Sequence, residues 1–276
     1  PVKACGWQDV FDAVHYPNRS MQNSGALSLR SYVPGEPNED CLFLNITTPA
    51  LTGSLRPVMV WIHGGGFVGG SANEYDTRVL SRQGDMVVVS LNFRVGTLGF
   101  LDLSSHGEAY HGSACNGLRD IILALQWVRD NIDEYGGDPQ NITLAGQSSG
   151  ATKVLALLGA PSADGLFHKA IANSATCAYF PARDQSKKLA EKLAVKRADV
   201  MPTLLSMTAQ EIVDLGLRYR ITVDGTVVTR PTFDAIQYRG NYGVPLLTGS
   251  NLNEGTLYTR GLDIAQDHYA AFNCSL

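Results

Sequence analysis

Two adjacent serines stand between glycines where a short apolar run passes into a helical pattern. Residues 146–150 read Gly-Gln-Ser-Ser-Gly and match the pattern G-x-S-x-G. Such a turn holds its central serine exposed at the tip, because the flanking glycines let the strand and helix backbones approach closely. The free amides and the dipole of the helix N-terminus favour negative charge at this point. The pattern therefore predicts that Ser148 is a nucleophile and that the N–H of Ser149 helps to hold an oxyanion; a chance Gly/Ser loop is the alternative.

A second glycine-rich stretch supplies complementary chemistry. Residues 61–70 read WIHGGGFVGG and overlap the end of an apolar run. Consecutive glycines leave backbone amides unshielded, and acyl transfer needs such donors directed at the tetrahedral oxygen. We expect Gly65 and Gly66 to supply them together with Ser149. A flexible glycine turn is the alternative, but the two motifs in this order make a specific combination. His63 could serve as a base, although a histidine at the start of such a loop usually orders the loop.

Alternating apolar runs and amphipathic stretches must position these two loops. The apolar runs are mostly continuous, which is typical of strands covered on both faces of a parallel sheet. They occupy residues 42–46, 57–62, 86–91, 142–145 and 244–249. Helical patterns cover residues 117–132 and 185–195, and Thr208 with Glu211 fits a capping box that opens another helix. This alternation predicts an α/β fold with a mostly parallel central sheet flanked by helices, in a single domain over residues 1–276.

The composition limits the kinds of partner that the chain can have. Of its 276 residues 44% are hydrophobic, and the formal net charge is -4. No cluster of Lys and Arg stands out, so we expect no nucleic acid partner, and no apolar run is long enough for a membrane span. The five cysteines lack C-x-x-C spacing, so we expect no metal site. The oligomeric state and the compartment stay open, with an extracellular location favoured over a cytoplasmic one.

With both loops in place, the sequence resembles the type B carboxylesterases, the cholinesterase-like branch of the α/β-hydrolase fold. The matching segments follow the family order and are EDCLFLNI (39–46), VMVWIHGGGF (58–67), VVVSLNFRVGTLGFL (87–101), ALQWVRDNIDEYGGDPQNITLAGQSSGA (124–151), GLFHKAIANS (165–174), VDGTVVTRP (223–231) and LLTGSNLNEGTLY (246–258). The resemblance implies ester hydrolysis by a Ser-His-Glu triad without a metal or redox cofactor. It makes Ser148 the nucleophile and Glu254 the acid, and it implies an oxyanion hole formed by Gly65, Gly66 and Ser149.

Glu254 is less evident from the residues alone. It follows the predicted strand at 244–249, so it points toward the edge of the sheet where α/β proteins bind ligands. A solvated carboxylate in a turn is the alternative, and without the resemblance we would favour it.

The sequence departs from the family pattern at several positions. Ser20 stands where the family has a cysteine ahead of Cys41, which leaves Cys5 as an alternative partner for that thiol. Gln147 takes a position that is commonly glutamate. Family members extend further at both ends, and their histidine lies well downstream of the glutamate; none of the six histidines here has that context. We therefore expect an α/β-hydrolase domain truncated at both ends, with doubtful activity on its own.

Three functional hypotheses follow from these observations. The leading one is a serine carboxylesterase that acts on uncharged, small-molecule esters, with a histidine outside this sequence as the base. The second is a compact α/β hydrolase that uses His268 as the base. The third is a non-catalytic cholinesterase-like module for binding or adhesion. The intact serine, glycines and glutamate favour the first hypothesis, while the acyl and alcohol groups of the substrate stay open.

Overall fold

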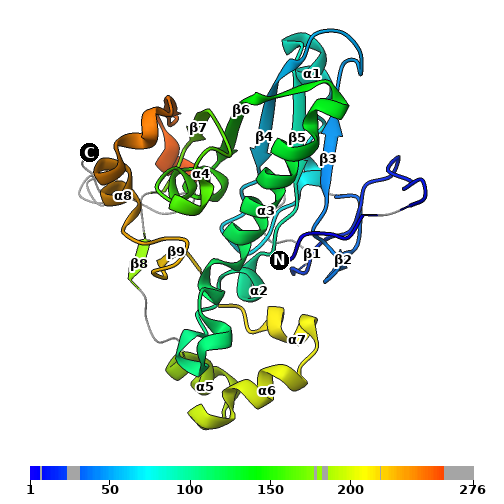
Figure 1. The fold of residues 1–276 in the computed structure, drawn as a ribbon. Coiled ribbons are helices and arrows are strands. Elements are labelled where there is room, and N and C mark those ends of the chain that lie inside the picture. Colours follow the sequence, from blue (N-terminus) through cyan, green and yellow to red (C-terminus); the bar gives the residue numbers. More distant parts are fainter. Residues whose placement is uncertain (7, 24–31, 177–178, 182–185, 218, 258–276) are drawn as a thin grey trace.

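The protein is built on a six-stranded sheet with the strand order β10-β7-β6-β4-β5-β3 (Figure 1). The computed structural model describes all residues except 7, 24–31, 177–178, 182–185, 218 and 258–276. The strands of this sheet are β3 (Leu44–Thr47), β4 (Arg56–Ile62), β5 (Val87–Leu91), β6 (Gly137–Gln147), β7 (Lys169–Asn173) and β10 (Leu246–Gly249). Only β3 is antiparallel to its neighbour, so the prediction of a mostly parallel sheet is confirmed.

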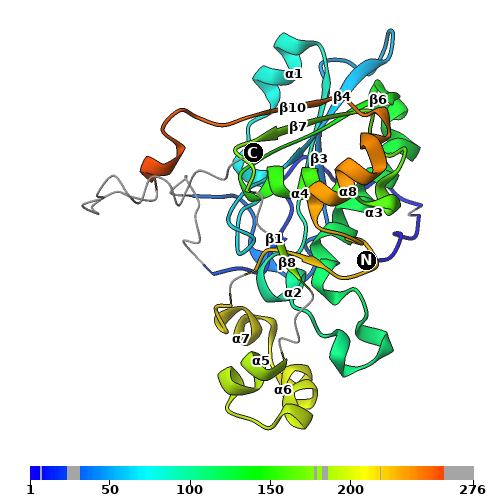
Figure 2. The ribbon, with the colours of Figure 1, turned by 90° about the vertical axis from the view of Figure 1, so that its left-hand side faces the viewer.

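Helices pack on this sheet and also extend beyond it. Helix α4 contacts β4, β6 and β7, α3 contacts β6, and α8 packs against α4. Helices α5, α6 and α7 lie together away from the sheet (Figures 1 and 2). The helices are α1 (Arg78–Gly84), α2 (Gly96–Phe100), α3 (Asn116–Asn131), α4 (Ser149–Leu158), α5 (Ser186–Leu193), α6 (Val200–Ser206), α7 (Ala209–Asp214) and α8 (Thr232–Arg239). None of the helices in the described ranges has the length and hydropathy needed to cross a bilayer.

Two short parallel pairs lie outside the central sheet. Strand β1 (Arg19–Ser20) pairs with β2 (Pro37–Asn38), and β8 (Tyr179–Pro181) pairs with β9 (Ile221–Val223). Each strand has two or three residues, so its sequence is too short to carry a periodic pattern.

Burial explains why the sequence patterns predict most of the central elements. All five residues of β5 are buried, which requires the unbroken apolar run of a strand covered on both faces. In α3 the predicted apolar stripe is buried and consists of Leu118, Ile121, Ile122, Leu125 and Val128. The capping box is also confirmed, since the Thr208 hydroxyl accepts the Glu211 N–H and the Glu211 carboxylate accepts the Thr208 N–H.

Two features differ from the expectations. Strand β7 is not among the predicted strands, because only Ala170 and Ala172 within it are fully buried and alanine gives a weak apolar signal. The pairing of Cys5 with Cys41 was wrong, since both are free thiols, Cys5 exposed and Cys41 buried. Ser20, which stands at the position of the family cysteine, is buried, and its hydroxyl donates to the carbonyl of Phe93.

The register brings four strand ends to the same edge of the sheet. Ile62 of β4 pairs with Gly146 of β6, Gln147 pairs with Asn173 of β7, and Asn173 pairs with Gly249 of β10. The chain therefore leaves all four strands at one level, on the carboxyl edge where open α/β sheets bind their ligands. The glycine loop follows β4, the serine turn follows β6, and Glu254 follows β10.

Candidate active site

Ser148 occupies a strained turn between β6 and α4. Its backbone angles are φ 56° and ψ -128°, a region that costs a residue with a side chain about 1–3 kcal/mol. Two hydrogen bonds hold it there: its N–H donates to the carbonyl of Asn173 at 2.9 Å, and its carbonyl accepts the Thr152 N–H at 3.0 Å. The Ser148 side chain is partly exposed, whereas Ser149 is only 4% exposed. Of the two serines, Ser148 is therefore the one that a substrate can reach.

The glycines beside Ser148 are required by close backbone contacts. A Cβ atom at Gly150 would lie 2.2 Å from the carbonyl oxygen of Ile62. At Gly146 it would lie 2.7 Å from the carbonyl carbon of Gly150. Both distances are far inside van der Waals contact, so α4 can start this close to the end of β4, and β6 can turn into α4 this sharply, only without these side chains. These contacts explain why the G-x-S-x-G pattern requires glycine at both positions.

The glycine loop after β4 lies directly beside the serine. A Cβ atom at Gly64 would be 3.3 Å from the Cβ of Ser148. Gly65 and Gly66 have φ angles of 110° and 63°, and the Gly65 carbonyl accepts the N–H groups of Val68 and Gly69, both at 3.1 Å. Within the described residues, the N–H groups of Gly65 and Gly66 donate no hydrogen bond to a protein group. These amides are therefore available to an oxygen atom bound next to Ser148.

His63 is part of the support of this loop. The ring is 1% exposed and stacks on Phe93 with the centroids 4.2 Å apart, and Nδ1 donates to the Gly64 carbonyl at 2.8 Å. Burial lowers the pKa of His63 to about 3, so the imidazole stays neutral near neutral pH. A Cβ atom at Gly70 would lie 2.5 Å from Nδ1. These contacts agree with a role in ordering the loop rather than in proton transfer.

Glu254 lies at the start of a short 3₁₀ helix (Glu254–Leu257) after β10. Its Oε2 accepts the Asn251 N–H and the Ser174 hydroxyl, both at 2.8 Å. These two hydrogen bonds lower the pKa of Glu254 from its ordinary value, with the larger contribution from Asn251. Ser174 directly follows Asn173, whose carbonyl holds the Ser148 N–H. A short path through the end of β7 thus connects the serine turn with the carboxylate.

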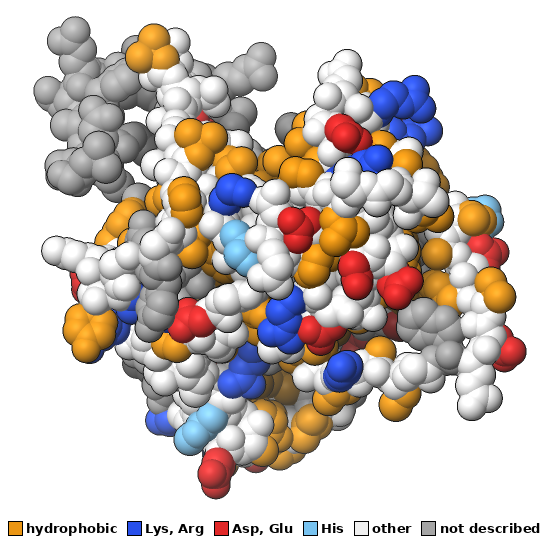
Figure 3. Space-filling view, turned by 45° about the horizontal axis from the view of Figure 1, so that its top comes forward, with side chains coloured by type: hydrophobic (Ala, Val, Ile, Leu, Met, Phe, Trp, Pro, Cys, Tyr) orange, Lys and Arg blue, Asp and Glu red, His pale blue; other side chains and the backbone are white. Residues whose placement is uncertain are grey.

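Strand β10 and the loop after it leave hydrophobic side chains exposed near Glu254. Leu247 is 64% exposed and Leu252 is 98% exposed. Apolar surface is therefore uncovered on β10 and on the loop that carries Glu254. On the face shown in Figure 3, hydrophobic side chains lie scattered among acidic and basic ones.

No described histidine joins the serine to the carboxylate. Within the described residues, His15, His63, His106, His111 and His168 make no hydrogen bond to Ser148 or Glu254. His168, for example, accepts the Ile142 N–H through Nδ1 at 3.1 Å. His268, the base of the compact-hydrolase hypothesis, lies outside the described residues, so its role stays a prediction.

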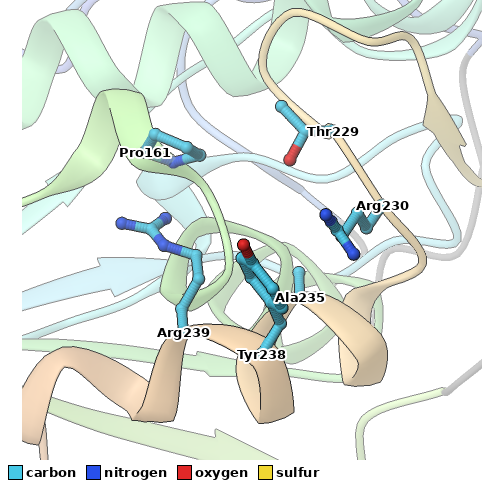
Figure 4. A pocket seen from close by; sticks show the side chains of 6 residues that line it. All are labelled: Pro161, Thr229, Arg230, Ala235, Tyr238 and Arg239. Carbon is cyan, nitrogen blue, oxygen red and sulfur yellow. The ribbon is translucent and has the colours of Figure 1, made fainter.

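Two cavities lie apart from this arrangement. One of about 420 Å³ is bounded by Pro161, Thr229, Arg230, Ala235, Tyr238 and Arg239, and Figure 4 shows both arginine side chains at it. The Arg230 guanidinium lies 4.1 Å from the centroid of the Tyr238 ring. A second cavity, of about 380 Å³, adjoins Ser20, Cys41 and Arg94. Neither is lined by Ser148 or Glu254, so we assign the chemistry to the edge of the sheet.

Three residues of the site were not predicted from the sequence. Asn173 ends the unpredicted strand β7 and Ser174 directly follows it, and no local pattern relates them to Glu254. Lys153, which lies beneath the serine turn, carries a signal that could have been used. It is a single charge in the otherwise apolar stretch of α4, in a helix that the strand-turn-helix motif already places in the interior.

A mostly parallel sheet with a strained serine after one strand and a glycine loop after its neighbour defines the α/β-hydrolase class. The model of the carboxylesterase family matches residues 1–273, and the chain belongs to this family. It is 37% identical over 270 residues to para-nitrobenzyl esterase of Bacillus subtilis and 34% identical over 274 residues to human carboxylesterase 3. These alignments cover 91% and 92% of this chain but 55% and 47% of the relatives. The chain thus spans about half the length of the curated relatives that it matches.

Solved structures agree with this assignment. A thermophilic para-nitrobenzyl esterase superposes with a TM-score of 0.85 at 34% identity, over 96% of this chain and 58% of the other. A carboxylesterase of Geobacillus stearothermophilus gives a TM-score of 0.78 at 37% identity, over 87% of this chain and 51% of the other. The predicted α/β-hydrolase fold is therefore confirmed.

Proposed function

We propose that the protein containing this chain is a serine carboxylesterase that hydrolyses uncharged carboxylic esters. The observation that carries the proposal is the strained, partly exposed Ser148 beside a glycine loop with available amides. A residue with a side chain keeps such a conformation only where its surroundings hold it, and such strain gathers at active sites. The names of the relatives, which are esterases, support the same activity.

The proposed reaction proceeds in two steps. The Ser148 hydroxyl attacks the ester carbonyl carbon while a histidine imidazole takes the hydroxyl proton. The oxyanion that forms accepts hydrogen bonds from the N–H groups of Gly65, Gly66 and Ser149. Collapse of this intermediate breaks the bond to the alcohol, which leaves with the proton from the imidazolium, and an acyl-enzyme remains. Water, deprotonated by the same imidazole, then releases the acid and restores the serine.

Glu254 would orient this imidazole and stabilise its charged form. Its two donors, Asn251 and Ser174, hold the carboxylate ionised at lower pH than usual, which suits a group that must stay an anion. The imidazole would come from a histidine other than the five described ones. In the carboxylesterase family the base lies well downstream of the glutamate, whereas His268 lies only 14 positions after Glu254. We therefore expect His268→Ala to leave esterase activity unchanged in the intact protein, and an inactive His268→Ala protein would support the compact-hydrolase alternative.

Covalent labelling of the intact protein tests the nucleophile. A fluorophosphonate should form one adduct, on Ser148, and Ser148→Ala should abolish both labelling and ester hydrolysis. Ser149→Ala should still label at Ser148 and should lose far less hydrolysis than Ser148→Ala, because an alanine keeps the backbone amide. Peptide mapping that finds the adduct on Ser149, or on no serine, would overturn the assignment, and no adduct at all would favour the non-catalytic module.

A further inference from the structure

Helix α4 carries a single charged side chain, and that side chain is completely buried. Lys153 is 0% exposed, in a helix whose ten residues are all buried. Lysine is almost never fully buried without a partner, because taking an ammonium group out of water is costly. Buried Asp120, by contrast, forms an ion pair with Arg94 at 2.7 Å. Among the described residues, no carboxylate lies within ion-pair distance of Lys153.

The contacts of Lys153 all lie behind the proposed oxyanion hole. Its Nζ donates to the Ser149 carbonyl at 3.1 Å and lies 3.4 Å from the Ser149 Oγ. The same Oγ accepts the N–H of Phe67 at 3.4 Å. The Nζ also lies over the ring of Phe67, 3.9 Å from its centroid, with Phe93 and Phe100 at 5.0 and 5.5 Å. Aromatic faces attract a cation, so they replace part of the lost hydration.

Phe67 is the residue through which these contacts reach the glycine loop. It directly follows Gly66 and has a φ angle of 67°, which a bulky residue adopts only when its surroundings hold it there. Its carbonyl accepts the Gly96 N–H at 2.6 Å, and its ring packs edge-to-face on Phe100. Lys153 and Ser149 hold the remaining sides of this residue, its ring face and its N–H.

We propose that Lys153 is a positioning residue for the oxyanion hole, because its amine links Ser149 of α4 to Phe67 of the glycine loop. The inference rests on the proposed esterase function. The hole needs the N–H of Ser149 from one element and the N–H groups of Gly65 and Gly66 from another. The link fixes these two elements relative to each other, so the three donors stay directed at one point.

The chemistry of the amine suits this role. Burial lowers the pKa of Lys153 to about 7, and both the ammonium and the amine form can donate to the Ser149 carbonyl. The neighbouring titratable group is His63. Burial makes the largest contribution to lowering the pKa of His63, and the charge of Lys153 lowers it further. His63 is therefore neutral and adds no second positive charge beside the ammonium. Negative charge that develops in the hole favours the charged form of Lys153 by Coulomb attraction.

Lys153→Met in the intact protein tests the link, because methionine keeps the length and the apolar stem but removes the amine. We expect kcat for a neutral ester to fall about 10- to 100-fold, the range for a displaced oxyanion donor, with KM unchanged. The inhibition constant of a trifluoromethyl ketone, whose adduct with serine places an oxyanion in the hole, should rise by the same factor. A merely structural lysine would change the thermal midpoint without this parallel loss. Lys192→Met, at an exposed lysine of α5, should leave kcat, KM and the inhibition constant unchanged.

A double-mutant cycle with Ser149→Ala completes the test. Ser149→Ala removes the hydroxyl that both Lys153 and Phe67 contact, so it should lower kcat several-fold and add little to Lys153→Met. Wild-type kcat in Lys153→Met, or fully additive losses, would overturn the inference. If Lys153→Met does not fold, wild-type kcat in Ser149→Ala overturns it instead. A wild-type protein that neither hydrolyses esters nor labels at Ser148 would refute the proposed function itself, which is a different result.

Discussion

Replacement of Lys153 by methionine should stabilise the folded protein, and by more at pH 6 than at pH 9. The reason is that burying a cationic group costs free energy, and no carboxylate among the described residues pairs with the Lys153 ammonium. Burial lowers the pKa of Lys153 from 10.5 to about 7. Methionine has a similar length, fits irregular apolar spaces and makes favourable sulfur–aromatic contacts, so it should pack against Phe67, Phe93 and Phe100.

The sign and size of the effect follow from proton linkage. Below pH 7 the amine is protonated in both states, and the folded state carries the full cost of the buried charge. Between pH 7 and 10.5 the unfolded chain binds a proton that the folded chain does not, so the free energy of unfolding rises with pH. At about 1.4 kcal/mol per pKa unit, the cost is about 4–5 kcal/mol at pH 6 and about 2 kcal/mol at pH 9. Methionine removes this cost, so its advantage should be larger by about 2–3 kcal/mol at pH 6.

Urea unfolding of the intact wild-type and Lys153→Met proteins at both pH values provides the measurement. The difference between the two proteins is compared across pH, so that the titration of all other groups cancels. Lys192→Met makes the same substitution at an exposed lysine and should show no pH-dependent difference. An equal effect of Lys153→Met at pH 6 and pH 9, or a destabilisation at pH 6, would refute the reasoning.

Three further predictions follow from the geometry of the site. Ser148→Gly should raise the free energy of unfolding by about 1 kcal/mol relative to Ser148→Ala in urea unfolding, because only glycine is unstrained at φ 56°; equal stability of the two variants would contradict this. Ser174→Ala removes one hydrogen-bond donor to Glu254, so the pKa of Glu254 should rise toward its ordinary value. The acid limb of the pH profile of kcat/KM should then move to higher pH, and kcat should fall about tenfold. An unshifted acid limb would argue against a role for this carboxylate. Choline esters should have a lower kcat/KM than neutral esters of matched acyl chain. Cholinesterases bind the quaternary ammonium on a tryptophan in the loop that corresponds to residues 20–41, which contain no tryptophan here, and Gln147 is uncharged; a preference for the choline ester would refute this.

Local physical chemistry made several features predictable from the sequence. The serine turn needs glycines for close backbone contact and a helix to follow, and these demands fall on five consecutive residues. The buried strand β5 needs an unbroken apolar run, and α3 needs an apolar stripe with helical spacing. In each case the residues that satisfy the constraint are neighbours in the chain, so the pattern is complete within a short window.

Only the tertiary structure decided which distant residues meet. Ser174 and Glu254 are 80 positions apart, and their contact depends on the register of β10 on β7. Neither residue carries a local signal of it, because a strand's register is set by its partner as well as by its own sequence. The surroundings of Lys153 are of the same kind. Its place in an apolar stretch indicates burial, but the ring of Phe67 and the hydroxyl of Ser149 reach it only because β4 and β6 are neighbours in the sheet, which brings the glycine loop over the start of α4.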